Sequence, residues 1–261
     1  MKKNLIVAQS GGPSVAINAT LAGVIAAAQA APGIDRVYGG IHGVEGIQAG
    51  KIVDLTDFHE MEKLKATPAM ALGSCRCKLP PVDQKDADIY QNLRRVFAEY
   101  DIGYFLYIGG NDSMDTVCKL THLFAGEPDA PVFLGLPKTV DNDLPLTDHT
   151  PGYGSAAKYL AITMNEIIQD TAIYAVPAVT IVEVMGRNAG WLTLAAGMPR
   201  FAGGPKPDII ALPEVPFDEE EFLRQIRETL SHSPNVVAAV SEGIRDKNGE
   251  YVGGSAKSGA V

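Results

Sequence analysis

The sequence predicts an α/β fold built on mainly parallel sheets. Short apolar runs alternate with longer segments of helical periodicity, and each run ends in glycine, proline or a polar cluster, as buried parallel strands do. The proposed strands are Leu5–Ala8, Tyr104–Ile108, Val132–Leu136, Val179–Val184, Ile209–Leu212 and Val236–Val240. The proposed helices are Ser14–Ala30, Gln84–Tyr100, Met114–Phe124, Gly154–Asp170 and Asp218–Ser231.

Two prolines, Pro145 and Pro151, interrupt the chain after the third strand. They predict a boundary between a lobe of residues 1–145 and a lobe of residues 146–261. The Gly/Ser-rich end, Gly253–Gly259, is expected to have no fixed fold.

The composition limits the classes of partner. The chain has 261 residues, 46% of them hydrophobic, and a formal net charge of −9. No basic stretch with interleaved aromatic residues predicts a nucleic-acid groove. No apolar run reaches the ~18 residues that cross a bilayer, and Leu5–Ala8 is too short for the core of a signal peptide. We expect a cytoplasmic protein with neither nucleic acid nor membrane as a partner.

A first glycine turn follows the first strand and reads Ser10-Gly11-Gly12-Pro13-Ser14. We predict that Ser14 caps the next helix, whose N-terminus points outward and stabilises an anion. The same turn also serves as an ordinary strand-to-helix connection that binds nothing. It matches neither G-x-G-x-x-G nor G-x-x-x-x-G-K-[ST], which disfavours dinucleotide dehydrogenases and P-loop enzymes.

A second glycine turn, from Gly109 to Asp115, follows the second strand. Asp112 is placed at the end of a strand, where a magnesium-phosphate complex binds well. An alternative is that Asn111, Asp112 or Ser113 caps the following helix. The two interpretations are compatible with each other.

The third turn is the most specific pattern in the chain and reads P-K-T-V-D-N-D from Pro137 to Asp143. The segment contains two acids with one residue between them, a lysine and a threonine hydroxyl. Phosphoryl transfer uses such groups as a base, a carboxylate near the metal and a cation. A surface turn also accommodates D-N-D without a function.

Six motifs occur in the order and rough spacing found in the phosphofructokinases: G-G-P-S, G-S-C-R, G-G-N-D-S, P-K-T-V-D-N-D, G-Y-G-S-A and M-G-R-N-A-G-W. The sequence therefore resembles that family over nearly its whole length. The resemblance implies two Rossmann-like lobes, with residues 1–145 binding the phosphoryl donor and residues 146–261 binding a sugar phosphate. It also implies a Mg²⁺-dependent transferase of glycolysis that forms a homodimer or homotetramer.

The resemblance also implies a role for particular residues. Asp141 corresponds to the base that deprotonates the 1-hydroxyl of fructose 6-phosphate, and Lys138, Thr139 and Asp143 accompany it as catalytic residues. The residues implied to bind the donor are Gly11, Gly12, Arg76, Gly110, Asp112 and Ser113. Those implied to bind the sugar are Thr139, Asp141, Met185, Gly186, Arg187 and Glu214. Asn111 and Asp112 are the positions expected to hold Mg²⁺.

Two positions indicate the donor. ATP-dependent members carry a glycine where this chain has Asp112 and another where it has Lys138, which leaves room for the α-phosphate. Both substitutions resemble the pyrophosphate-dependent enzymes. An aspartate would obstruct an α-phosphate, whereas a lysine can neutralise pyrophosphate directly.

The sequence departs from the family pattern in three places. Asn111 replaces a metal-binding aspartate and offers a neutral oxygen. The segment Val176–Val179 lacks the arginine that reaches a neighbouring subunit's sugar phosphate in many relatives. The family pattern also continues past the part matched here, so we expect either a shortened chain or a natural reduced form, with the second lobe and the return to the first incomplete.

Four functions remain open from the sequence. The leading one transfers phosphoryl from pyrophosphate to fructose 6-phosphate, and an ATP-dependent 6-phosphofructokinase is its close alternative. A non-catalytic regulatory or sugar-binding homologue would retain the fold without turnover. A kinase acting on another phosphorylated sugar or on a nucleoside is the fourth, because part of the sugar-phosphate grip is missing.

Overall fold

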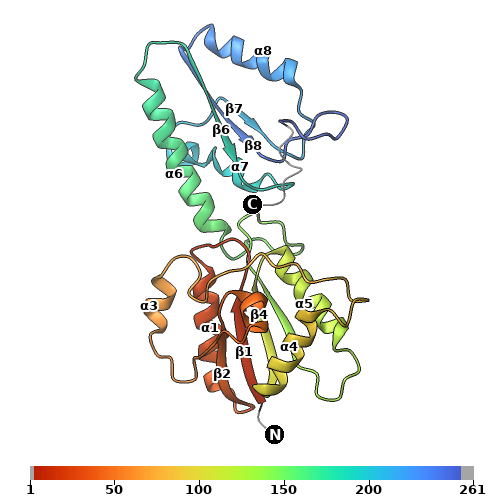
Figure 1. Cartoon of the computed structure of the whole chain (residues 1–261). Helices are drawn as coiled ribbons and strands as arrows, with labels where there is room; N and C mark the ends of the chain where they lie inside the picture. Colours follow the sequence, from red (N-terminus) through yellow and green to blue (C-terminus); the bar gives the residue numbers. More distant parts are fainter. Residues whose placement is uncertain (1–2, 254–261) are drawn as a thin grey trace. The chain divides into compact units, whose positions relative to one another are not determined.

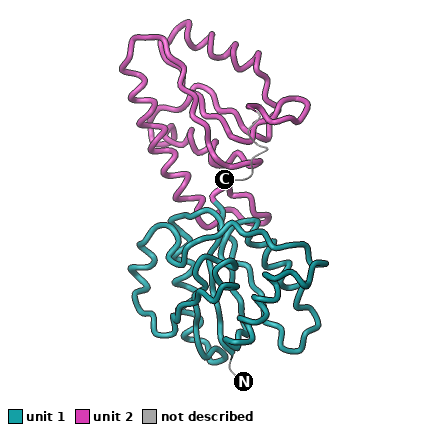
Figure 2. The backbone as a smooth tube through the Cα atoms, in the orientation of Figure 1, with its two compact units in different colours: residues 1–139 teal, residues 140–261 magenta. Residues whose placement is uncertain are grey.

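The computed structural model describes residues 3–253 and has an α/β fold (Figure 1), which confirms the predicted class. The chain divides into two compact units, residues 1–139 and residues 140–261 (Figure 2). Most of the Gly/Ser-rich end that we expected to have no fixed fold lies outside the described residues. Among the described residues, no helix is long and apolar enough to cross a membrane.

Unit 1 contains a five-stranded sheet of order β3-β2-β1-β4-β5. All neighbouring pairs are parallel except β2 with β3. The central strand β1 is buried on both faces, and Ile6, Val7 and Ala8 are each 0% exposed, as expected for a strand covered by helices on both sides. The strands are β1 (Lys3–Gln9), β2 (Ile34–Gly40), β3 (Ile52–Asp54), β4 (Ile102–Gly109) and β5 (Val132–Pro137).

Helices cover both faces of this sheet (Figure 1). The helices α1 (Ile17–Ala30) and α3 (Met61–Ala66) pack on one face through a cluster that includes Leu21 and Leu64. The opposite face carries a second cluster formed with α2 (Gly43–Gln48), α4 (Asp88–Glu99) and α5 (Asn111–Leu123).

Unit 2 contains a three-stranded parallel sheet of order β6-β8-β7. Its strands are β6 (Ala178–Val184), β7 (Ile209–Ala211) and β8 (Asn235–Ser241). The helices α6 (Tyr153–Ala172) and α7 (Trp191–Ala195) contribute to clusters on one face, next to the 3-10 helix η1 (Met198–Ala202). The other face packs against α8 (Glu219–Leu230) through Ile226.

The structure contains elements that the sequence pattern does not predict: β2, β3, α2, α3 and α7. Asp35 and Arg36 interrupt the apolar run of β2, so that strand gives no continuous signal. Glycines at positions 43 and 46 lower the intrinsic helix propensity of α2. Tertiary packing therefore decides these elements.

Candidate active site

Three of the predicted motifs follow adjacent parallel strands in unit 1. Gln9 of β1 pairs with Ile108 of β4, and Gly109 of β4 pairs with Pro137 of β5. Because parallel strands end at one edge of a sheet, the three following loops emerge side by side. Ligands in open α/β sheets bind at this edge.

These loops lie against one another. A Cβ built on Gly11 would lie 3.7 Å from the backbone nitrogen of Gly110, and one built on Gly12 would lie 3.9 Å from Lys138 Nζ. The Lys138 amide donates a hydrogen bond of 2.7 Å to the Gly109 carbonyl. Gly11 has φ +79°, a conformation that a side chain disfavours. The structure thus brings Gly11, Gly12, Gly110 and Lys138 together.

The segment that carries Arg76 joins the same loops. Ser74 Oγ donates to the Gly11 carbonyl at 2.7 Å, and the Gly11 amide donates to the Cys75 carbonyl at 3.3 Å. Arg76 itself is exposed. The guanidinium is therefore attached to a segment that hydrogen-bonds directly to the first glycine turn.

Ser113 is predicted to bind the donor, but the structure gives it an internal contact. It is 3% exposed, and its Oγ lies 2.5 Å from Ser10 Oγ. A Cβ on Gly109 would lie 2.1 Å from Ser113 Oγ, so glycine is required there. Ser113 thus links the end of β1 to the start of α5.

Two predicted helix caps are wrong. The helix α1 begins at Ile17 with Ala16 as its N-cap residue and no side-chain cap, because the chain stays irregular beyond Ser14. Ser14 Oγ is buried without a hydrogen-bond partner. The N-cap residue of α5 is Gly110, again with no side-chain cap.

The charges at this edge have different environments. Lys138 is 6% exposed, and its Nζ donates to the Gly12 carbonyl at 2.5 Å. Asp112 is exposed at the start of α5, with Lys78 Nζ 3.9 Å from its carboxylate. Lys78 was not predicted from the sequence. The sequence could have indicated Lys78 by its position two residues after Arg76, since alternate residues of an extended segment lie on the same side.

The P-K-T-V-D-N-D segment passes from unit 1 into unit 2 after Thr139. Thr139 is buried, Asp141 is half-buried and Asp143 is exposed. Asn142 is 6% exposed and adopts φ 58°. Its amide donates to the Asp148 carbonyl at 3.0 Å and accepts from the Thr150 amide at 2.9 Å. Asn142 therefore fixes the loop that carries the two aspartates.

The other predicted residues of unit 2 follow strands of its sheet. Met185–Arg187 follows β6 and Glu214 follows β7, and Glu242, which was not predicted, follows β8. Val184 pairs with Ser241 in the parallel register, so the first and third of these loops start together. Met185 is 64% exposed. Unit 2 thus has its own cluster of candidate residues at a carboxyl edge.

Glu242 is a residue that the sequence interpretation missed. Its Oε1 accepts hydrogen bonds from the Gly186 amide at 3.1 Å and the Arg187 amide at 3.0 Å. Both donors have positive φ, 142° and 51°. A Cβ on Gly243 would lie 1.5 Å from the Arg187 carbonyl oxygen. The sequence could have indicated Glu242 because it is a glutamate directly after a buried strand.

Glu214 also fixes the backbone of this loop. Its Oε1 accepts from the Gly190 amide at 2.7 Å, at the start of α7. Asn188, in the same loop, accepts a hydrogen bond of 3.3 Å from Arg245, whose guanidinium lies 3.9 Å from the centre of the Tyr251 ring. The loop is therefore held by side chains that follow β7 and β8.

Oxygen ligands for a metal are few at these edges. Among residues 3–253 no group of three or more His, Cys, Asp or Glu side chains gathers as a metal cluster. Asn111 and Asp112 are both exposed at the start of α5. Mg²⁺ commonly uses one or two carboxylates together with substrate phosphates and water, and this pair suits that mode better than an all-protein cage.

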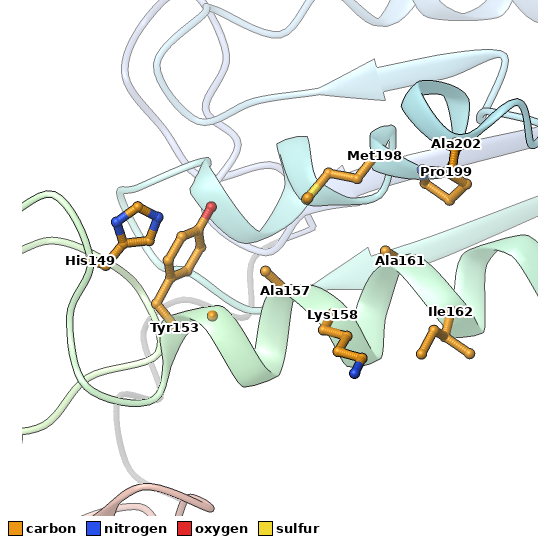
Figure 3. Close-up of a pocket in the computed structure, with 10 residues that line it drawn as sticks. His149, Tyr153, Ala157, Lys158, Ala161, Ile162, Met198, Pro199 and Ala202 are labelled. Carbon is orange, nitrogen blue, oxygen red and sulfur yellow. The ribbon is translucent and has the colours of Figure 1, made fainter.

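A cavity of about 390 Å³ lies elsewhere in unit 2, between α6 and η1 (Figure 3). Its lining includes His149, Tyr153, Lys158 and Met198. None of the predicted site residues lines it. The candidate charged side chains gather at the strand ends instead.

The chain is similar to several known proteins. The chain is 38% identical over 253 residues to a pyrophosphate–fructose 6-phosphate 1-phosphotransferase of Rhodospirillum rubrum, covering 96% of this chain and 61% of that protein. It is 41% identical to the protein of the same name from Xanthomonas campestris, covering 95% and 60%. The crystal structure of a pyrophosphate-dependent phosphofructokinase from Nitrosospira multiformis matches with a TM-score of 0.84 and 38% identity, covering 95% and 62%.

The chain thus spans about 60% of the length of these relatives. The phosphofructokinase family model matches residues 4–259, which include every strand end described above. With nearly the whole chain aligned at this level, the protein belongs to the phosphofructokinase family.

Proposed function

We propose that this chain carries the phosphoryl-transfer machinery of a pyrophosphate-dependent 6-phosphofructokinase, which transfers phosphoryl from pyrophosphate to the 1-hydroxyl of fructose 6-phosphate. The observation that carries the proposal is the buried Lys138 amine against the Gly12 carbonyl, at an edge also lined by Gly11 and Gly110. An ammonium group and backbone amides at strand ends suit a compact, highly charged donor.

The donor choice rests on Asp112 and Lys138. Asp112 stands at the start of α5 beside Lys78, and Lys138 occupies space next to Gly12. Both side chains fill positions where a nucleotide's α-phosphate needs glycine. The names of the relatives at 38–41% identity favour the same donor.

A pyrophosphate donor at this edge is compatible with a bound Mg²⁺ ion. Asn111 and Asp112 would offer it oxygen ligands, with the diphosphate and water completing its coordination. When bound, the ion neutralises charge on the transferring group. Arg76 and Lys138 would orient the donor's phosphates from the protein side.

The sugar side of the proposal uses unit 2. Met185, Gly186 and Arg187 would bind fructose 6-phosphate, with Glu214 accepting from a sugar hydroxyl. Asp141 would remove the proton of the 1-hydroxyl, with Thr139 beside it and Asp143 near the metal. The half-buried position of Asp141 on a loop fixed by Asn142 supports this role. We also propose a homodimer or homotetramer.

Replacing both donor-selecting residues tests the proposal. We expect Asp112→Gly with Lys138→Gly to lower kcat/KM for pyrophosphate by ~100-fold or more and to allow turnover with ATP, since the obstruction and the cation are both removed. Initial rates with each donor, at saturating fructose 6-phosphate, provide the measurement. Asp115→Gly, on the same helix, is the matched control.

The result separates the alternatives. A double variant that keeps its full preference for pyrophosphate contradicts this account of donor choice. A parent that uses only ATP establishes the ATP-dependent alternative. A parent that binds fructose 6-phosphate in calorimetry but turns over neither donor establishes the non-catalytic homologue.

A further inference from the structure

A short hairpin follows the last strand of unit 2 and carries polar side chains that the proposed reaction does not use. It runs from Ile244 to Val252, with an antiparallel bridge between Arg245 and Tyr251. We call this segment the 244–252 hairpin. The Val252 amide donates to the Ile244 carbonyl at 3.1 Å, and the Phe217 amide donates to the Arg245 carbonyl at 2.7 Å. These bonds fix the base of the hairpin to the loop before α8.

Arg245 has a defined orientation in this hairpin. Its guanidinium lies 3.9 Å from the centre of the Tyr251 ring, donates to the Tyr251 hydroxyl and donates to the Gly249 carbonyl at 3.0 Å. A planar guanidinium can stack on a ring and bond in its own plane at the same time, whereas an ammonium group cannot. None of the ion pairs among the described residues uses Arg245. Neutral acceptors and the ring therefore set its orientation.

The same guanidinium also contacts Asn188, the residue directly after the M-G-R sequence. Asn188 Oδ1 accepts from Arg245 Nη2 at 3.3 Å and from the Tyr251 hydroxyl at 3.3 Å. Within the described part of the chain, these two are the hydrogen bonds that Asn188 makes. The position of Asn188 therefore depends on its side chain, because no strand ladder or helix pairs its backbone.

The M-G-R turn, residues 185–188, is thus held at two points. Glu242 accepts from the amides of Gly186 and Arg187, and Asn188 is bonded to the hairpin. Both Gly186 and Arg187 have positive φ, and a strained conformation persists only when its surroundings determine it. The bond from the Ala189 amide to the Gly186 carbonyl, at 2.9 Å, lies within the segment itself. Without the hairpin contact, the end of the turn that follows Arg187 would be able to move.

We propose that Arg245 is a positioning residue of the sugar-phosphate site, which acts through Asn188 to hold the M-G-R turn in place. Its planar fork joins the turn to the ring and carbonyl of the hairpin, and the two contacts together need that shape. This inference rests on the proposed binding of fructose 6-phosphate by Met185–Arg187. It does not depend on the donor, because the predicted donor-binding residues belong to unit 1 and the hairpin belongs to unit 2.

The affinity for the sugar phosphate tests this role. We expect Arg245→Gln to raise the Kd for fructose 6-phosphate in calorimetry, and its KM, by ~10-fold or more, because small displacements of binding groups are costly. The change in kcat should be less than ~3-fold, since a displaced turn weakens ground-state and transition-state binding alike. The KM for pyrophosphate should stay the same. Arg227→Gln, which removes an exposed arginine of α8, is the matched control and should behave like the parent.

The conservative variant separates positioning from a direct electrostatic contact. Arg245→Lys retains the charge but loses the planar fork, so it should raise the Kd about as much as Arg245→Gln. If Arg245→Lys keeps the affinity of the parent, the charge alone is sufficient and the positioning role is wrong.

A double-mutant cycle tests whether Arg245 acts through Asn188. Asn188→Ala should raise the Kd to the same extent as Arg245→Gln, and the double variant should be no worse than either single variant, because one contact is lost in each case. Additive effects would mean that the two residues act independently, which would overturn the proposal.

The sugar titration is made without a donor, so its result is independent of turnover. An unchanged Kd in folded Arg245→Gln rejects only this inference. A parent that binds no fructose 6-phosphate rejects it together with the proposed sugar site. A parent that loses affinity on Arg245→Gln but turns over neither donor supports the inference and rejects only the reaction. Circular dichroism establishes folding, and Tyr251→Phe, which retains the ring, is the milder variant with an expected rise of ~3-fold in Kd.

Discussion

Three polar side chains of this protein connect separate segments around its candidate chemistry. Asn142 bonds two backbone groups across the D-N-D loop, Glu242 accepts from two amides of the M-G-R turn, and Ser113 links α5 to Ser10. Loops at strand ends need such bonds because no ladder or helix satisfies their backbone. The loops that carry the candidate reacting groups are therefore held by side chains of neighbouring residues.

Glu242 is the clearest case for a test at this scale. Arg187 has φ 51°, a conformation that costs of order 1–3 kcal/mol for a residue with a side chain. Glu242 stabilises it by accepting hydrogen bonds from the backbone amides of Gly186 and Arg187. We expect Glu242→Ala to raise the KM for fructose 6-phosphate by ~10-fold or more, with a smaller change in kcat. Steady-state kinetics measure both.

The conservative variant provides the control. Gln at position 242 retains an oxygen that can accept from Gly186 and Arg187, so Glu242→Gln should keep a KM close to the parent's. If Glu242→Gln raises the KM as much as Glu242→Ala does, the charge acts directly on the substrate and the positioning role is wrong. Glu183→Ala, on the exposed side of β6, controls for the loss of a nearby carboxylate.

Asp141 is expected to act as the base. Asp141→Asn should lower kcat by ~100-fold or more and leave the affinity for fructose 6-phosphate nearly unchanged, because a base acts mainly in the transition state. Single-turnover rates and calorimetry with the sugar measure the two effects. Asp143→Asn serves as the paired variant, and equal kcat for Asp141→Asn and the parent would remove Asp141 from this role.

Motifs at strand ends predicted which candidate residues lie close together. Gly11, Gly12, Gly110 and Lys138 are brought together as the alternating pattern indicates. Ser14 was predicted as a cap and is not one, because the start of α1 depends on the path of the turn rather than on composition. Glu242 and Lys78 were missed because a single charged residue outside a motif gives only a weak signal until the strand order is known.

The elements of unit 1 were predicted where burial on both faces makes a strand continuously apolar. This holds for β1 and β4, whereas β5 is an apolar edge strand in which Val132 and Leu134 remain 49% and 47% exposed. The pairing of these three strands also determines the positions of the three loops. The order β3-β2-β1-β4-β5 itself does not follow from the pattern, because β2 is interrupted by charges and β3 has only three residues. Long-range pairing, which local sequence does not encode, supplies the rest.

One side chain connects β4 to α2 and to the segment before Arg76. Tyr107 is 1% exposed, its Oη accepts from the Val44 amide at 3.2 Å, and Cys75 Sγ lies 3.5 Å away. Burial raises the pKa of the Tyr107 hydroxyl above the ordinary value for a phenol. The folded protein therefore holds this proton more tightly than the unfolded chain does.

The sign of the pH dependence follows. The contribution of Tyr107 to stability is complete below about pH 10 and is lost as the pH rises further, because the unfolded chain releases the proton first. We expect Tyr107→Phe to be about 1–3 kcal/mol less stable at pH 8, where the Val44 amide loses its acceptor. Its stability should then fall less than the parent's between pH 8 and pH 11.

Urea unfolding at the two pH values gives both differences. Tyr159→Phe, at an exposed position, should follow the parent at each pH. An equal loss of stability in the parent and in Tyr107→Phe would mean that other groups account for the alkaline effect.

At the scale of the whole molecule, the buried clusters are each confined to one unit. Those of the five-stranded sheet draw on residues before position 140, and those of the three-stranded sheet draw on residues from position 140 onward. A unit with its own core and its own sheet meets the requirements for independent folding. A chain of ~140 residues also buries a fraction of its surface sufficient for a stable domain.

We therefore expect residues 1–139, expressed alone, to fold into a unit that unfolds cooperatively in urea. One hazard is the edge strand β5, where Val132 and Leu134 are 49% and 47% exposed, because such an edge promotes association between molecules. Val132→Thr with Leu134→Thr should reduce that association and preserve the fold, since threonine retains strand propensity. Circular dichroism and urea titration of both fragments provide the measurement. A fragment without a cooperative transition, in both versions, would mean that the core of unit 1 depends on residues beyond Thr139.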